Sequence, residues 1–410
     1  MKHYRWLMLL WMWGAAASAG AGSSLAALVN ERLELMDEVA AYKWVNDRGI
    51  EDSEREAVVI ARAVEDGLRH GLTPASTRTF FEAQIEAAKS IQRHWFDVWS
   101  RSGGPREAPD LDGVVRPELL RLGAAILEAA AEGPGGCRTS ALAGGIDVAG
   151  LEDGVREELV AAAAGLRRFD SRLDQILETG ILRVGTTGDY PPFSHRAEGD
   201  DAYRGIDIDL ARDLGDALGV EVAFVPTSWP ELMADLAAGR FDIGMSGISR
   251  TLARQRQAHL STPYHVGGKT PIARCEEAGR LGSVAAIDRP GVRVVVNPGG
   301  TNERFVDERL QQAKKVLHED NRTIFEVLVT GGADVMITDR VEVALQAAAY
   351  PELCATTPET FTYQEKAYLM PRDGPWNAFV DTWLELALND GTVGRVYDAH
   401  GVRHSLPRAR

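Results

Sequence analysis

The segment ILRVGTT (residues 181–187) begins the pattern that decides the fold of the C-terminal part of the chain. It is followed by GIDIDLARDLGDALG (205–219), VEVAFVP (220–226), SWPELMADLAAGR (228–240) and FDIGMSG (241–247). Short β-branched runs that alternate with helical patterns indicate βαβ units and a mainly parallel sheet. The alternation is interrupted after YHVGGKTPIARC (264–275) and resumes with VRVVVNP (292–298) and DVMITD (334–339). We therefore expect an α/β domain of two lobes, with a ligand cleft at the carboxyl ends of the strands.

The preceding residues have a different periodicity. Gly and Pro are rare between residues 24 and 100, and apolar residues recur at spacings of three and four. This spacing is typical of amphipathic helices. It predicts helices at about 24–45, 52–70 and 74–100, a further helix from Pro117, and another near 151–168. The sequence thus predicts a multidomain chain, with an all-α domain at residues 22–168 and a two-lobed α/β domain at residues 169–410.

The composition and the first residues bear on partners and location. The formal net charge is -15, which argues against a nucleic-acid partner because phosphate binding needs clustered Lys and Arg. Residues 1–21 combine a basic start, an apolar run from Trp6 to about Ala17, and small residues near Ala19. This pattern predicts a cleavable signal peptide, and the run is too short for a membrane anchor. We expect an exported protein with no membrane association after cleavage.

Export makes a disulfide possible, and the chain has three cysteines, Cys137, Cys275 and Cys354. Cys275 and Cys354 both lie beside strand-like runs in the C-terminal half, which favours that pair. Buried free thiols are the alternative. Cys137 is left over.

The helical half carries charged residues at regular spacing. Arg32 and Lys43 are eleven residues apart, which puts them on nearly the same helix face. Arg55 and Glu56 follow in the next predicted helix, and Gln92 lies on the third. A solvated charged face is the alternative for any one of these residues alone.

These residues resemble the pattern of the all-helical chorismate mutases, in particular the exported subclass, over roughly residues 24–168. That pattern is an Arg, a Lys eleven residues later, Asp-x-x-Arg-Glu after a turn, and a Gln at the end of the third helix. The matching positions are Arg32, Lys43, Asp52, Arg55, Glu56 and Gln92. The exported subclass supplies another Arg from a later helix, for which Arg116 is the candidate. Ala88 departs from the small hydroxyl residue of some relatives.

The resemblance implies a pericyclic rearrangement of chorismate to prephenate, with no nucleophile, metal or cofactor. Arg32 and Arg55 would bind the two substrate carboxylates, since guanidinium binds carboxylate bidentately. Lys43 and Gln92 would donate to the ether oxygen, where negative charge grows in the transition state. Related mutases are commonly dimers, so we expect a homodimer through the helical domain.

The C-terminal half resembles the periplasmic solute-binding proteins of the amino-acid type over residues 175–400. The resemblance implies a type II binding-protein fold and a periplasmic location. In this family an early Arg grips the ligand carboxylate, Ser and Thr residues support it, and an Asp of the second lobe takes the ligand amino group. The corresponding residues are Arg254, Ser246, Ser249, Thr301 and Asp339.

The closer likeness is to the cyclohexadienyl dehydratases, which convert prephenate to phenylpyruvate and arogenate to phenylalanine. It is carried by TTGDYPPFS, PTSWPELM, VNPGGTNERF, TDRVE and EKAYLMPRD, among other colinear segments. It implies that Glu342 is the general acid for the departing hydroxyl. Its pKa would have to rise by roughly two units from about 4.3 for work near neutrality. Trp229 is a candidate wall of the cleft.

The same likeness implies the remaining site residues. Lys269 and Arg254 would bind substrate carboxylates, Asn297 and Thr301 would be neutral donors, and Asp189 and Asp339 would complete the polar lining. Which cation faces which carboxylate stays open. The segments ARCEE and ELCAT also match, which supports a bridge from Cys275 to Cys354.

Two hypotheses follow. The first is a bifunctional exported enzyme, a chorismate mutase joined to a prephenate or arogenate dehydratase; the two resemblances name consecutive steps. The second is an amino-acid receptor with a helical oligomerisation domain. Glu342 and Lys269 discriminate between them, because a receptor needs no acid at the leaving group. Asp207 and Asp209 allow a metal pair or, as we expect, helix capping.

Overall fold

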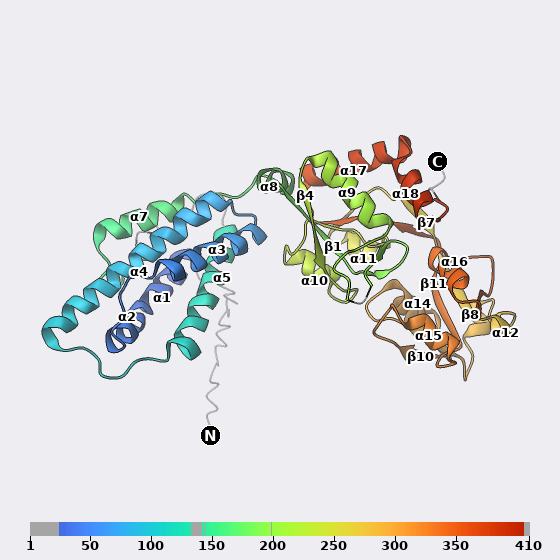
Figure 1. The fold of residues 1–410 in the computed structure, drawn as a ribbon, viewed down its shortest axis with the longest axis horizontal. Coiled ribbons are helices and arrows are strands. Elements are labelled where there is room, and N and C mark those ends of the chain that lie inside the picture. The colour runs from blue at the N-terminus through green and yellow to red at the C-terminus, as the bar shows by residue number, and fades with distance from the viewer. Residues whose placement is uncertain (1–23, 133–141, 143, 198, 406–410) are drawn as a thin grey trace, which may run out of the picture. The chain divides into compact units, whose positions relative to one another are not determined.

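The computed structural model describes residues 24–132, 142, 144–197 and 199–405 (Figure 1). The predicted signal peptide and Cys137 lie outside the described residues. The chain divides into two compact units between Arg168 and Phe169. The first unit is helical and the second is α/β, so the predicted fold class is confirmed.

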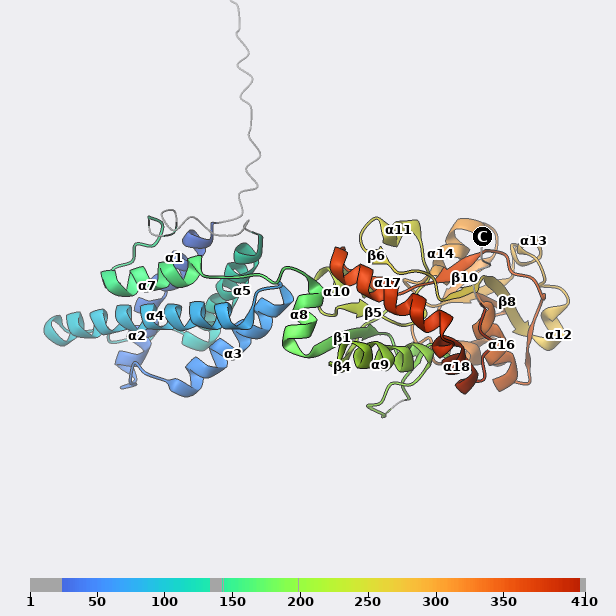
Figure 2. The same cartoon turned by 90° about the horizontal axis from the view of Figure 1, so that it is seen from above.

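The helical unit packs around one long helix, α4. Its described elements are α1 (Leu25–Glu34), α2 (Met36–Val45), α3 (Ser53–Arg69), α4 (Pro74–Ser102), the π-helical turn η1 (Leu111–Val115), α5 (Arg116–Glu132) and α7 (Asp153–Ala164). Figure 2 shows α4 running through the unit between α3 and α7. The buried side chains Phe80, Phe81 and Ile91 of α4 belong to one apolar core with Val29 and Leu33 of α1.

The helix predicted at 24–45 is two helices in the structure. Leu35 separates α1 from α2, with φ -70° and ψ -5° and its N–H bonded to the Leu33 carbonyl. That tightened geometry interrupts the helical ladder at one residue. The interruption was not visible in the sequence, because Leu is a strong helix former.

The α/β unit contains two five-stranded sheets. The first has the order β4-β1-β5-β14-β6, and the second has the order β10-β9-β11-β8-β12. The first lobe comprises α8 (Arg172–Thr179), β1 (Ile181–Thr186), β2 (Asp189–Tyr190), β3 (Ser194–His195), α9 (Ile206–Leu218), β4 (Glu221–Pro226), α10 (Leu232–Ala237), β5 (Ile243–Gly244), α11 (Leu252–Gln255), β6 (His259–Leu260), β14 (Leu369–Met370), α17 (Gly374–Asn389) and α18 (Thr392–Ala399).

The second lobe is built around the other sheet. It comprises β8 (Lys269–Arg274), α12 (Cys275–Ala278), α13 (Val284–Ile287), β9 (Arg293–Val296), α14 (Thr301–Arg309), β10 (Lys314–Leu317), α15 (Ile324–Val329), β11 (Val335–Asp339), α16 (Arg340–Ala349) and β12 (Leu353–Ala355). A separate antiparallel pair, β7 (His265–Gly267) with β13 (Gln364–Lys366), lies where the chain passes between the lobes.

Strand direction positions the residues that matter for function. Strands β1 and β4 are parallel, as are β9 and β10, and β9 and β11. Strand β8 runs antiparallel to β11, so its first residue, Lys269, pairs with the last residue of β11, Asp339. The register of the sheet therefore brings a cation and a carboxylate together at one strand end.

Two further features are a disulfide in the α/β unit and the character of the described helices. The structure joins Cys275 at the start of α12 to Cys354 of β12 by a disulfide. Among the described helices, none combines the length and the apolar character that crossing a bilayer requires.

The disulfide should stabilise the α/β unit alone. Replacing both residues (Cys275→Ser with Cys354→Ser) removes a crosslink between residues 79 apart. The chain-entropy relation for such a loop gives a loss of about 4 kcal/mol in the free energy of unfolding. Denaturant titration should show earlier unfolding of the α/β unit, with the helical unit as internal control. Unchanged unfolding of the α/β unit would contradict the assignment.

Candidate active sites

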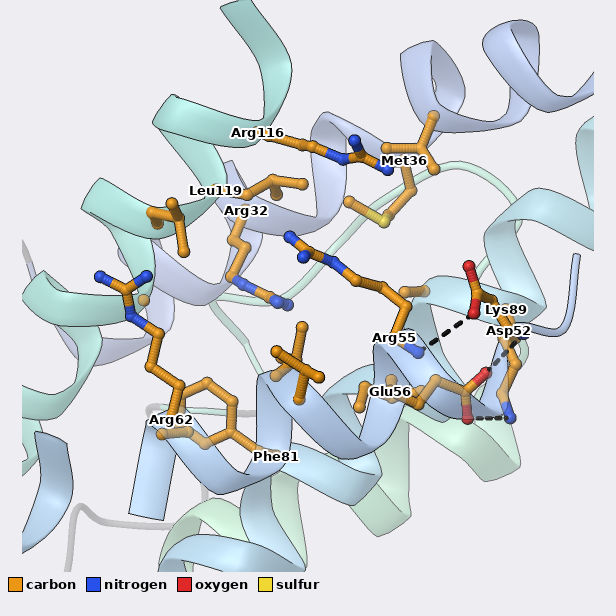
Figure 3. A pocket seen from close by; sticks show the side chains of 18 of the residues that line it. Arg32, Met36, Asp52, Arg55, Glu56, Arg62, Phe81, Lys89, Arg116 and Leu119 are labelled. Atoms are coloured by element: carbon orange, nitrogen blue, oxygen red, sulfur yellow. Dashed lines mark hydrogen bonds and ion pairs between the residues drawn. The ribbon is translucent and has the colours of Figure 1, made fainter. Parts of the chain in front are cut away.

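The helical unit encloses a cavity of about 340 Å³. This volume suits a small organic ligand. The cavity receives side chains from α1, α2, α3, α4 and α5 (Figure 3). All seven residues predicted for the helical half line it: Arg32, Lys43, Asp52, Arg55, Glu56, Gln92 and Arg116. The fold thus brings together residues that are up to 84 positions apart in the chain.

The first turn of α3 presents Arg55 and Glu56 through its capping. The Asp52 side chain accepts a hydrogen bond from the Arg55 N–H at 3.1 Å, which satisfies one of the free donors of the helix start. In return, Glu56 Oε1 accepts from the Asp52 N–H at 3.3 Å. The matched Asp-x-x-Arg-Glu segment is therefore a reciprocal cap that fixes where Arg55 leaves the helix.

Arg32 is a buried cation without a carboxylate partner in the described part of the chain. Its side chain is 8% exposed, its Nη1 donates to Gln84 Oε1 at 3.4 Å, and its Nε has no partner. Burial lowers its pKa to about 10, so it remains charged at neutral pH. Figure 3 shows the guanidinium groups of Arg32 and Arg55 directed into the same space. A buried unpaired cation is costly, and an anionic ligand would offset that cost.

Lys43 and Gln92 are the polar lining residues proposed to act on the ether oxygen. The Lys43 Nζ donates to the Ile50 carbonyl at 2.5 Å, which leaves two N–H groups for other acceptors. Burial lowers the pKa of Lys43, against the opposing charges of Asp52 and Glu56. Gln92 Nε2 donates to the Ala88 carbonyl at 3.1 Å, while its Oε1 is buried without a partner. Rotation of the amide by half a turn exchanges these two atoms.

The sequence did not single out two further cations of the cavity, Arg62 and Lys89. Arg62 Nε lies 3.7 Å from Asp66 Oδ2, one turn further along α3. The Lys89 Nζ approaches Glu56 Oε2 at 3.3 Å and Glu86 Oε1 at 2.5 Å. Helical spacing was the available signal, since Arg62 is seven residues after Arg55 and Lys89 three before Gln92.

A second site lies between the lobes of the α/β unit. Its lining residues are Tyr190, Trp229, Gly247, Ser249, Arg254, Lys269, Asn297, Gly300, Thr301, Asn302, Asn321, Asp339 and Lys366. Seven of the predicted residues are among them, while Asp189, Ser246 and Glu342 are not. The cavity measures only about 30 Å³, space for about one water molecule. The lobes are therefore closed on this site.

Of the three predicted residues outside the lining, Ser246 and Asp189 form hydrogen bonds with other residues of the first lobe. Ser246 Oγ accepts from the Thr187 N–H at 3.2 Å. Asp189 Oδ1 accepts from Trp229 Nε1 at 3.2 Å, which fixes the indole. Burial raises the pKa of Asp189, and bonds from Thr187 and Trp229 oppose this rise.

Asp339 is the centre of the polar network in this site. Lys269 Nζ donates to its Oδ1 at 2.8 Å, Lys366 Nζ donates to its Oδ2 at 2.6 Å, and the Tyr190 hydroxyl also donates to Oδ2. Burial raises the pKa of Asp339, but the two ammonium groups outweigh burial and hold the pKa well below its usual range. Asp339 was expected to accept from a ligand amino group, and in the structure the protein's own lysines compete for both of its oxygens.

Glu342 lies in the first turn of α16 and is 1% exposed. Burial raises its pKa to about 8, aided by the nearby charge of Asp339 and opposed by a hydrogen bond from Thr338. Thr338 Oγ1 donates to Glu342 Oε2 and accepts from Asn302 Nδ2 at 3.1 Å. Glu342 is therefore a carboxylic acid at neutral pH, linked to the cavity through Thr338 and Asn302.

Arg254 supplies a further buried cation from the first lobe. It is 6% exposed, and its Nη1 donates to the Ser249 carbonyl at 2.8 Å. Burial, and then repulsion from Arg304, lower its pKa to about 10. Thr301 begins α14 after Gly300, and Asn297 precedes that turn, so both meet the cavity beside a helix N-terminus.

Asp207 differs from its expected role. Gly205, and not an aspartate, caps α9, and Asp207 lies buried in the first turn. Its Oδ2 accepts from the Gly247 N–H at 2.5 Å and from the Tyr264 hydroxyl at 2.8 Å. Gly247 has φ +61°, and a Cβ there would come within 2.6 Å of the Tyr190 ring. Asp207 thus anchors a cavity loop that only glycine fits.

Comparison with known proteins agrees with both halves of this description. Residues 182–402 match the family of bacterial extracellular solute-binding proteins, family 3, and residues 23–93 match chorismate mutase type II. Cyclohexadienyl dehydratase of Pseudomonas aeruginosa is 50% identical over 249 residues, which are 60% of this chain and 92% of that protein. A secreted chorismate mutase of Mycolicibacterium smegmatis is 36% identical over 100 residues, 23% of this chain and 55% of that protein.

A solved structure supports the α/β unit. It is an ancestral amino acid-binding protein, described as a precursor of cyclohexadienyl dehydratase. It is 36% identical, with a TM-score of 0.52, and the match covers 56% of this chain and 98% of that one. Both expected resemblances are thereby confirmed. The chain belongs to the bacterial extracellular solute-binding proteins of family 3, preceded by a helical unit whose residues 23–93 match chorismate mutase type II.

Proposed function

We propose that the chain is a bifunctional enzyme that converts chorismate to prephenate in the helical unit and prephenate to phenylpyruvate in the α/β unit. The observation that carries the second step is Glu342, a buried acid with its pKa raised to about 8 beside a pair of buried lysines. The similarity to a chorismate mutase and to a cyclohexadienyl dehydratase supports consecutive steps.

The helical cavity supports the first step by its charge. Chorismate carries two carboxylates, and Arg32, Arg55 and Arg116 are the cations proposed to bind them. Held between them, the substrate would keep the folded shape from which its carbon–oxygen bond breaks as the new carbon–carbon bond forms. Lys43 then donates to the ether oxygen as charge accumulates there, together with Gln92 after rotation of its amide. No proton is transferred in this rearrangement.

The inter-lobe site supports the second step by its acid. Glu342 would give its proton to the ring hydroxyl as the carbon–oxygen bond breaks, releasing water. The ring carboxylate leaves as carbon dioxide, and the electron pair of its carbon–carbon bond completes the aromatic ring. Glu342 is left ionised and regains a proton from solvent. We assign Arg254 and Lys269 to the substrate carboxylates, and Asn297 and Thr301 to neutral donation.

The small inter-lobe cavity implies a movement. Prephenate does not fit into about 30 Å³, so the lobes must separate for entry and close again around the substrate. In the closed form Glu342 is buried, and burial raises its pKa.

A receptor for amino acids is the other candidate. The family match and the ancestral binding protein favour it at the level of fold. It would need an acidic group free to accept the ligand amino group, yet both Asp339 oxygens already accept from lysines. The contacts of Asp339 therefore favour the enzyme.

We further propose the setting in which the enzyme works. Residues 1–21 act as a cleaved signal peptide, residues 22–168 and 169–410 form the two domains, and the mature protein lies in the periplasm. We also propose a homodimer formed through the helical domain, because related mutases are commonly dimers. Size-exclusion chromatography of the mature chain, with light scattering, tests the dimer, and a monomer would contradict it.

The acid can be tested by Glu342→Gln. An amide cannot supply the proton, so phenylpyruvate formation should fall by roughly 10²–10⁴-fold while prephenate accumulates from chorismate. Both products are followed by absorbance and chromatography. Glu326→Gln, at an exposed position of α15, is the matched control. Continued phenylpyruvate formation by the Glu342 variant would exclude the assignment.

The pH dependence of the second step gives an independent test. Only protonated Glu342 is active, so kcat for dehydration should be constant below pH 7 and fall as pH rises through about 8. Measurement of kcat from pH 6 to 9.5 checks this, with the mutase step in the same samples as a reaction without proton transfer. A kcat that already falls about tenfold per pH unit from pH 6 upward, as for an acid with an ordinary pKa, would show that the pKa of Glu342 is not raised.

The first step can be separated by Arg55→Ala. Loss of a charged contact to a substrate carboxylate should lower kcat/KM for chorismate by roughly 10²-fold or more, and leave prephenate dehydration unchanged. Arg69→Ala, on the same helix but outside the cavity, is the control. Undiminished chorismate consumption would refute the role of Arg55, and loss of both steps would argue against separate sites.

A further inference from the structure

The α/β unit has a second hollow that shares no lining residue with the inter-lobe site. It measures about 930 Å³ and lies against the outer face of α16, the strand β7 and the segment 401–405. Figure 1 shows α16 close to β7 and below α18. Helix α18 is the last helix of the described chain. This volume is within the range of small-molecule sites. The proposed reactions do not use it.

The charge of this hollow is opposite to that of the protein. Its lining includes Arg340, Arg403, His265 and His404 but no Asp or Glu, although the chain carries a formal charge of -15. Within the described part of the chain, neither Arg340 nor Arg403 has an acidic side chain at ion-pair distance. Two guanidinium groups without carboxylates favour an anion.

One lining residue, His265, is buried. It is 4% exposed, and its Nδ1 has neither a hydrogen-bond partner nor exposure to solvent. The ring is held in place by stacking on Tyr397, with the two centroids 5.7 Å apart. Burial, together with the charge of Lys366, lowers the pKa of His265 to about 4, so the imidazole is neutral at pH 7.

Much of the remaining wall is apolar. Val341, Ala344, Leu345 and Ala348 form one face of α16, at helical spacings of three and four, and Phe361 and Val402 add to it. The hydroxyl-bearing residues Thr360, Thr362, Tyr363 and Ser405 also line the hollow. A free phosphate or sulfate would leave this wall in water. The wall and the cations together require a ligand with an anionic head and an apolar body of substantial size.

We propose that this hollow is a binding site for an arylalkyl carboxylate, with the carboxylate between Arg340 and Arg403 and the ring against the α16 face. The neutral ring of His265 forms part of the wall and adds no charge to the site. The site goes beyond the proposed function and does not depend on it. The same helix buries Glu342 on its other face, so the ligand would contact the element that carries the proposed acid.

The experiment is isothermal titration calorimetry of the full chain with 3-phenylpropanoate. The protein carries Arg55→Ser and Arg254→Ser, which remove the carboxylate-binding arginines of the two proposed active sites. We expect one site per chain. Adding Arg340→Ser and Arg403→Ser should weaken binding by about tenfold or more, because each charged contact is lost. Both side chains are exposed, and thermal unfolding of each variant checks that it is folded.

Three controls make the result decisive. Arg289→Ser removes an exposed arginine of the same lobe outside the hollow and should leave the affinity unchanged. Ala344→Trp keeps the cations and fills the apolar space, so it should abolish binding. 3-Phenylpropylamine has the same ring and the opposite charge, and it should not bind. Absence of saturable binding, equal affinity in the Arg340 and Arg403 variant, or equal affinity for the amine would each overturn the proposal.

Discussion

The α/β unit depends on the pairing of Asp339 with two buried lysines. A carboxylate and two ammonium groups buried in a closed cleft are tolerable only when each is satisfied by the others. Lys269 comes from β8, Lys366 from β13 and Tyr190 from the first lobe, so this cluster joins both lobes and the strands between them. The excess positive charge of the cluster suits a substrate with carboxylates, and the negative charge of Asp339 helps to keep Glu342 protonated.

The helical unit uses buried charge differently. Arg32 has no carboxylate partner within the described residues, whereas Glu56 is held by the helix cap and by Lys89. Under the proposed function, the anion that Arg32 lacks is a carboxylate of the substrate. Both proposed reactions act on a dicarboxylate, which the helical unit would bind with arginines on its helices and the α/β unit in a cleft that closes.

The fold and many of the site residues could be predicted from the sequence, for identifiable reasons. The spacing from Arg32 to Lys43 and the cap at Asp52 are local, and helix geometry turns them into positions in space. The role of Glu342 was predicted from the likeness of the segment TDRVE to the cyclohexadienyl dehydratases. Lys366 and Tyr190 were not predicted, because their approach to Asp339 depends on how three separate strands and two lobes meet. Asp207 was expected to cap a helix, but Gly205 took that place and freed the aspartate for Gly247.

The pairing of Lys269 with Asp339 through the register of β8 and β11 has a consequence for tolerance to insertions and deletions. Side chains alternate between the two faces of a sheet, so a shift of one residue in β8 would send the lysine to the opposite face. The same shift would move the buried Ile272 and Ala273 out of their layers. A one-residue insertion or deletion in β8 would therefore yield an unfolded lobe and not a folded but inactive one. Every chain that forms the native sheet already has Lys269 paired with Asp339.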